Sequence, residues 1–119
     1  MKRPENTIII KTEAFADRII RMCRYLTDED KGEKDAIRQI YRSGTSVGAN
    51  TAESQYAQSR ADFLTKMTIA LKEANETKFW LGRLHSEDAL NDKEYNSIND
   101  DCVEIIKLLT SITKTIKTK

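Results

Sequence analysis

RSGTSVGANTAE, residues 42–53, is the segment around which the rest of the chain is arranged. Within it Gly44, Gly48 and Ala52 recur every fourth residue, so a helix would carry them as a stripe nearly free of side chains. Glycine inside a helix costs about 0.5–1 kcal/mol relative to alanine, so helix propensity alone would leave this segment unfolded. A neighbouring helix packed closely along the stripe would supply the missing stabilisation, and the sequence therefore predicts a tight helix contact here.

The composition is that of a single helical domain. One third of the 119 residues are charged, and the chain has one proline and four glycines. A chain of this length buries roughly two thirds of its unfolded surface and folds without disulfides or metals. Lys and Arg number 20 against 19 Asp and Glu, so no overall basic field attracts nucleic acid or anionic lipid. Binding of either would need a local patch.

The two cysteines and the apolar runs indicate in which cellular compartment the protein lies. Cys23 and Cys102 each lie in an apolar helical context, which favours reduced thiols that fill core space over a disulfide between them. The longest aliphatic run, residues 8–10, is too short for a signal peptide core or a membrane span. We therefore expect a cytoplasmic protein that does not cross a membrane.

Apolar spacing predicts one domain over residues 1–119, with four helices at about 12–26, 33–54, 60–86 and 92–117. The fold class is all-α, an antiparallel up-and-down four-helix bundle. Residues 1–11 fit either an extended strap or an earlier helix start from a cap at Asn6, and the sequence leaves that choice open. Ser59 with Asp62, and Asn91 with Glu94, have the spacing of helix capping boxes.

A polar line runs along another face of the second helix. It consists of Arg42, Ser46, Asn50 and Glu53. Such a line is either a solvated surface or a half-buried hydrogen-bonded network, since Ser and Asn are poor surface helix formers but useful partners inside a bundle. If the second and third helices are antiparallel around a turn at residues 55–58, Arg42 comes level with about Lys72 and Glu73. We therefore predict an ion pair between Arg42 and Glu73 or Glu76.

The fourth helix carries more apolar residues than one buried face needs. Its seam repeats with 3,4 spacing over Tyr95, Ile98, Cys102, Ile105, Leu109, Ile112 and Ile116. Val103, Ile106 and Leu108 lie outside that seam, which indicates a second contact surface that self-association would bury.

Basic residues offer candidate contacts to nucleic acid. The tail holds Lys107, Lys114, Lys117 and Lys119 with no acid among them, and Arg38 lies in the second helix. Lysines near a helix C-terminus are also explained by the helix dipole. Phosphate binding by Arg38, Lys107, Lys114 and Lys117 is the alternative.

Catalytic patterns are absent from the sequence. His85 is the only histidine and has no Glu three residues before it, so a di-metal carboxylate site is not supported. If Glu53, Glu73 and Glu76 share a face, a carboxylate-only site for a hard cation is the alternative to no metal site. Gly44 and Gly48 lie inside a helix and lack the Lys-Ser/Thr of a phosphate loop. We expect no catalytic residues, no metal and no cofactor.

Two motifs carry a resemblance to a known family. They are Gln39-x-x-Arg42-Ser43-x-x-Ser46-Val47-x-Ala49-Asn50-x-x-Glu53 and Phe63-x-x-Lys66-x-x-Ile69-Ala70-x-Lys72-Glu73-Ala74-x-Glu76-Thr77-x-x-Trp80-Leu81. The chain resembles the bacterial 23S rRNA-intervening-sequence proteins over nearly its whole length. The resemblance implies a four-helix bundle. Related proteins are accessory subunits of diversity-generating retroelements, which form pentameric rings that engage RNA and a reverse transcriptase.

Together these observations predict a non-enzymatic homo-oligomer that acts as a scaffold or accessory protein for RNA or a nucleic-acid enzyme. The resemblance implies that this oligomer is a pentamer. The competing prediction is a purely structural protein-protein interaction module that binds no nucleic acid.

Overall fold

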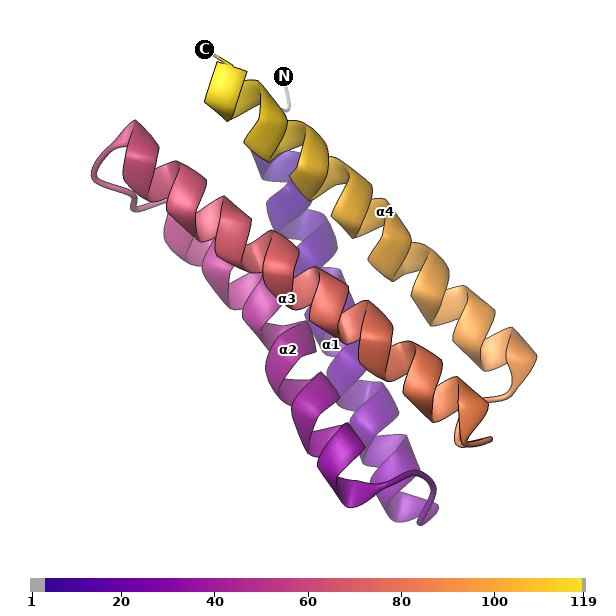
Figure 1. Ribbon diagram of the computed structural model, residues 1–119. Helices are drawn as coiled ribbons and strands as arrows, with labels where there is room; N and C mark the ends of the chain where they lie inside the picture. Colours follow the sequence, from indigo (N-terminus) through magenta and orange to yellow (C-terminus); the bar gives the residue numbers. More distant parts are fainter. Residues whose placement is uncertain (1–3, 119) are drawn as a thin grey trace.

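The computed structural model describes residues 4–118, which form four helices joined by short connections. They are α1 (Pro4–Asp28), α2 (Lys34–Ser54), α3 (Arg60–Ser86) and α4 (Asp92–Thr118). The helices run up and down along a bundle measuring 46 × 23 × 22 Å (Figure 1). This arrangement confirms the expected all-α antiparallel bundle.

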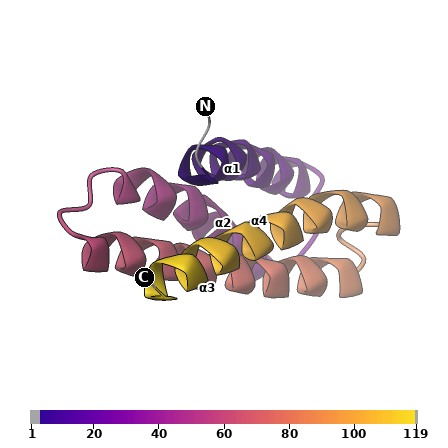
Figure 2. The ribbon, with the colours of Figure 1, turned by 90° about the horizontal axis from the view of Figure 1, so that it is seen from above.

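Each helix packs on two others. Consecutive helices are in contact, and α4 closes the bundle against α1. Figure 2 shows α1 and α3 on opposite sides of the bundle, and the described residues of these two helices make no close backbone contact. The glycine-containing helix α2 therefore lies between α1 and α3.

The first helix begins at Pro4, well before residue 12, so the segment left open in the sequence is helical rather than an extended strap. It does not start from a cap at Asn6; residues 1–3 lie outside the described residues. Proline suits the first helical turn because the amide hydrogen that it lacks has no partner there. The early start places Ile8 in the core, where it is fully buried.

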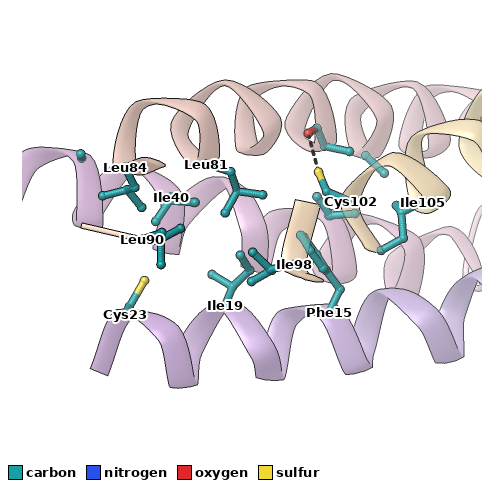
Figure 3. Close-up of a cluster of buried hydrophobic side chains, with 14 of the residues drawn as sticks. Phe15, Ile19, Cys23, Ile40, Leu81, Leu84, Leu90, Ile98, Cys102 and Ile105 are labelled. Carbon is teal, nitrogen blue, oxygen red and sulfur yellow. Dashed lines mark hydrogen bonds between the residues drawn. The ribbon is translucent and has the colours of Figure 1, made fainter. Parts of the chain in front are cut away.

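All four helices contribute to one apolar core (Figure 3). Figure 3 shows Phe15 and Ile19 of α1 in this core together with Ile40 of α2, Leu81 of α3 and Cys102 of α4. Both cysteines are free and buried, which confirms that they fill core space. Burial raises the pKa of the Cys23 thiol to about 11 and that of Cys102 to about 12, so both stay protonated at neutral pH.

The connections contain the expected signals. Ser59 caps α3 by accepting the Asp62 amide at 3.0 Å. Asn91 and Glu94 form a reciprocal box at α4, with bonds of 2.8 and 2.9 Å. Gly32, between α1 and α2, has a φ of +83°, a conformation that favours glycine. No helix in the described range is long and apolar enough to span a membrane.

Candidate functional site

The glycine stripe of α2 packs against α1. A Cβ added at Gly44 would lie 2.8 Å from Cγ1 of Ile19, and one added at Gly48 would lie 3.2 Å from the backbone oxygen of Thr12. Contacts under 3 Å force a neighbour to move, and Ile19 is fully buried and stiff at χ1. Glycine is therefore needed at Gly44, and Gly48 permits the close approach of the α1 backbone.

Ala52 does not extend this contact, because its side chain is exposed. The expectation that it shares the stripe was wrong. A step of four residues turns the helix by roughly 40° more than one full turn, so the stripe drifts away from α1 after two steps.

Two buried hydroxyl groups join α1 to α2 where the stripe ends. The side-chain oxygens of Thr12 and Thr51 lie 2.7 Å apart, and each also lies within hydrogen-bond distance of a carbonyl of its own helix, on Ile8 and Gly48. Both side chains are fully buried. Polar groups buried in this way need their partners, so the pair helps to fix how α1 and α2 meet.

The predicted ion pair of Arg42 is present and involves both candidates. Nη1 of Arg42 lies 3.2 Å from Oε1 of Glu73, and Nη2 lies 2.6 Å from Oε2 of Glu76. Glu76 also accepts a hydrogen bond from Nε1 of Trp80 at 3.2 Å. The hydrogen bond from Arg42, aided by that from Trp80, lowers the pKa of the Glu76 carboxyl below its usual range.

The rest of the polar line splits between helix-internal and interhelical contacts. Asn50 is half-buried and donates to the Ser46 carbonyl at 2.9 Å. Glu53 pairs with Lys66 of α3 at 2.9 Å, and that hydrogen bond raises the pKa of Lys66. The line is therefore a partly exposed network that joins α2 to α3, and its carboxylates already have cationic partners. Among the described residues no group of acidic, histidine or cysteine side chains is arranged to hold a metal ion.

The basic candidates do not form one cluster with this network. Arg38 pairs with Asp35 of its own helix. Lys107, Lys114 and Lys117 are exposed on α4, while Lys119 lies outside the described residues. The last turns of α4 are held beside the start of α3, since Arg60 donates to the Ile116 carbonyl at 2.7 Å.

The extra apolar residues of α4 are only partly covered. Ile98, Cys102, Ile105 and Leu109 of the seam are buried. Ile106 and Leu108 pack on the edge of the core and stay partly exposed, and Val103 is half-buried.

Sequence reasoning missed several surface features. Arg18 of α1 pairs with Asp101 of α4 at 2.7 Å, and Lys11 pairs with Glu104 at 3.1 Å, which ties the last helix to the first. A hollow of about 460 Å³ at Gly82 lies between α3 and the start of α4. No periodicity marks these features, because they depend on how separate helices meet.

Comparison with known proteins places this geometry in a family. The family model described as 23S rRNA-intervening sequence protein matches residues 5–111. A crystal structure of a protein of unknown function from the S23 ribosomal protein family of Bacteroides thetaiotaomicron VPI-5482 is 47% identical, with a TM-score of 0.90. The match covers 94% of this chain and 99% of that one. No curated protein matches the chain.

Proposed function

Because the chain belongs to the 23S rRNA-intervening sequence protein family, we propose that it is a non-enzymatic, homo-oligomeric scaffold or accessory protein whose partner is RNA or a nucleic-acid enzyme. The proposal has two parts, self-association and nucleic-acid binding, and different residues support each.

Self-association is supported by the apolar surface of α4. Val103, Ile106 and Leu108 keep part of their side chains exposed in the closed bundle, although Ile106 and Leu108 also pack on the edge of its core. A monomer gains nothing from exposed apolar area, whereas a contact with another copy would remove it from water. This observation carries the scaffold part of the proposal.

Nucleic-acid binding is supported by the basic end of α4. Lys107, Lys114 and Lys117 are exposed, and the sequence has no acidic residue after Glu104. Three lysines along one helix end give a local positive field despite the nearly neutral total charge. Arg38 contributes less, because it lies on α2 beside the carboxylate of Asp35, with which it pairs.

Solution mass by light scattering after size exclusion tests self-association. We expect a mass several times that of one chain, and a shift toward the monomer in Val103→Glu. Ser111→Glu, at an exposed position of the same helix, is the matched control and should leave the mass unchanged. A monomeric wild-type protein would contradict the scaffold part.

Binding of a structured RNA at low and high salt tests the other part. Neutralising Lys107, Lys114 and Lys117 to glutamine should weaken binding and reduce its salt dependence. An oligomer that binds no RNA even at low salt would instead favour the second candidate function, an interaction module that contacts proteins only.

A further inference from the structure

The hollow at Gly82 has an unusual lining. Its walls are two aromatic rings, Phe79 and Tyr95, and two cations, Lys78 and Arg83, with Asn75 and Ser86 as polar groups. No carboxylate is among the described residues that line it. Three other grooves on the described surface each include one, namely Glu94, Asp28 and Asp30.

Gly82 has no structural reason to be glycine. It lies within α3, and a Cβ added there would meet nothing within 4 Å outside its own helix backbone. Because glycine inside a helix is destabilising, alanine would suit the bundle better at this position. What glycine provides instead is open space against the helix backbone, where a flat ring can approach closely.

Neighbouring rings hold the two aromatic side chains of the hollow in place, and the Phe79 ring stays exposed to solvent. Phe79 is 57% exposed, and its ring meets that of Trp80 edge-on at 4.9 Å. Tyr95 is stacked on one side by His85, at 4.2 Å between ring centres and 6° between planes. His85 in turn lies 2.7 Å from Asp92 at the start of α4, so the Tyr95 ring is fixed as part of the wall.

The cations on the rim have few competing partners. Arg83 is half exposed, and its nearest carboxylate, Glu87, lies 3.9 Å away, at the limit of an ion pair. Lys78 is exposed and has no ion-pair partner in the described part of the chain. Both are therefore free to contact an anionic ligand.

From this combination we infer that the hollow binds an unpaired nucleotide of a nucleic-acid strand. The base stacks on Phe79 and lies over Gly82, and Lys78 and Arg83 contact the flanking phosphates. The side chains of Asn75 and Ser86 already donate hydrogen bonds to carbonyls of α3, so their oxygen atoms accept hydrogen bonds from the edge of the base. The volume of the hollow, about 460 Å³, falls within the roughly 300–1,000 Å³ that is typical of small-ligand sites. A paired base cannot enter, because its faces are covered within the duplex. The inference rests on the nucleic-acid part of the proposed function and adds a site separate from the lysines of α4.

Fluorescence anisotropy with short labelled oligonucleotides tests the site. The probes are an oligoadenylate RNA, the same sequence as DNA, and a duplex of the RNA. We expect the single strands to bind and the duplex to bind at least about tenfold more weakly, since each stacked base strengthens binding by about that factor. Tighter binding of RNA than of DNA would identify RNA as the natural source of the nucleotide, and equal binding would leave either strand as a ligand.

Two variants address the hollow directly. Gly82→Leu fills it and Phe79→Ala removes the stacking surface, and each should weaken single-strand binding about tenfold. Ile69→Ala, which shortens another exposed side chain of α3 outside the hollow, is the matched control. Thermal melting by circular dichroism should show Gly82→Leu folded, because the added side chain enters open space.

The outcomes separate this inference from the proposed function. If both variants bind like the wild type while the Lys107, Lys114 and Lys117 variant loses binding, the hollow site is wrong and nucleic-acid binding stands. If the wild type binds no strand at low salt, both fail. If oligoglutamate displaced the labelled strand as readily as unlabelled RNA does, binding would depend on charge alone. That result would overturn the inference that the hollow binds a base.

Discussion

Gly44 and Gly48 of α2 and Gly82 of α3 are all helical glycines, but their surroundings are opposite. At Gly44 the neighbouring helix is so close that a Cβ would lie 2.8 Å from Ile19, whereas at Gly82 a Cβ would meet nothing within 4 Å. At Gly44 and Gly48 the absence of a side chain lets α1 and α2 pack closely together. At Gly82 nothing in the described part of the chain fills that space, and we propose above that a ligand does. The comparison thus separates a glycine that the helix packing requires from one that it does not require.

The largest loss of stability should come from placing a side chain in the contact between α1 and α2. Gly48→Leu would push a side chain into the α1 backbone at Thr12, and overpacking of this kind should lower the unfolding free energy by about 3 kcal/mol or more. Urea unfolding measures the loss. Ala52→Leu, on the same helix but exposed, should stay within about 0.5 kcal/mol of the wild type. Equal stability of both variants would contradict the tight packing of α1 against α2 at Gly48.

The buried hydroxyl pair beside Gly48 should give a smaller effect. Thr51→Val removes one partner of the 2.7 Å contact and should lower the unfolding free energy by about 1–2 kcal/mol. Thr12→Val together with Thr51→Val should cost less than the sum of the two single changes, because each single change already removes the one contact that the two hydroxyls share. A double-mutant cycle measures this coupling. Strict additivity would mean that the two hydroxyls do not act together and that shape alone joins α1 to α2.

The polar contact between α2 and α3 should matter least, because its charges are partly exposed. Arg42→Ala should lower the unfolding free energy by about 0.5–1 kcal/mol at neutral pH. Since folding lowers the pKa of Glu76, the contribution of this pair is fully present above the ordinary pKa of that carboxyl and is lost as the pH falls through the lowered value.

Urea unfolding of the wild type and Arg42→Ala at neutral pH and near pH 3 measures that dependence. The difference between them should shrink in acid. Arg38→Ala is the control, since Arg38 pairs with Asp35 only within its own helix. A difference that stays constant with pH would rule out Glu76 as the partner that matters.

Features that repeat along one helix could be predicted from the sequence. Apolar spacing gave the four helices, and the length of the turn between α2 and α3 set the register that brought Arg42 to Glu73 and Glu76. The helix-capping residues predicted where α3 and α4 start. Each of these depends on neighbours in the chain or on a single antiparallel hairpin.

Features that depend on how separate helices meet could not be predicted. The start of α1 at Pro4 follows from a place for Ile8 in the core, which only the assembled bundle provides. The exposure of Ala52 follows from where α1 crosses α2. The hollow at Gly82 had only weak signals, a glycine within a helix and a large apolar residue, Phe79, off the buried face.

The most direct test of the comparison is to change Gly44 and Gly82 to alanine one at a time and measure thermal unfolding side by side. Gly44→Ala should lower the melting temperature by several degrees, because the fully buried Ile19 must move. Gly82→Ala should raise it slightly, because the helix gains about 0.5–1 kcal/mol and nothing is displaced. Shifts in the same direction would contradict the account, since the two glycines would then have the same role in the fold.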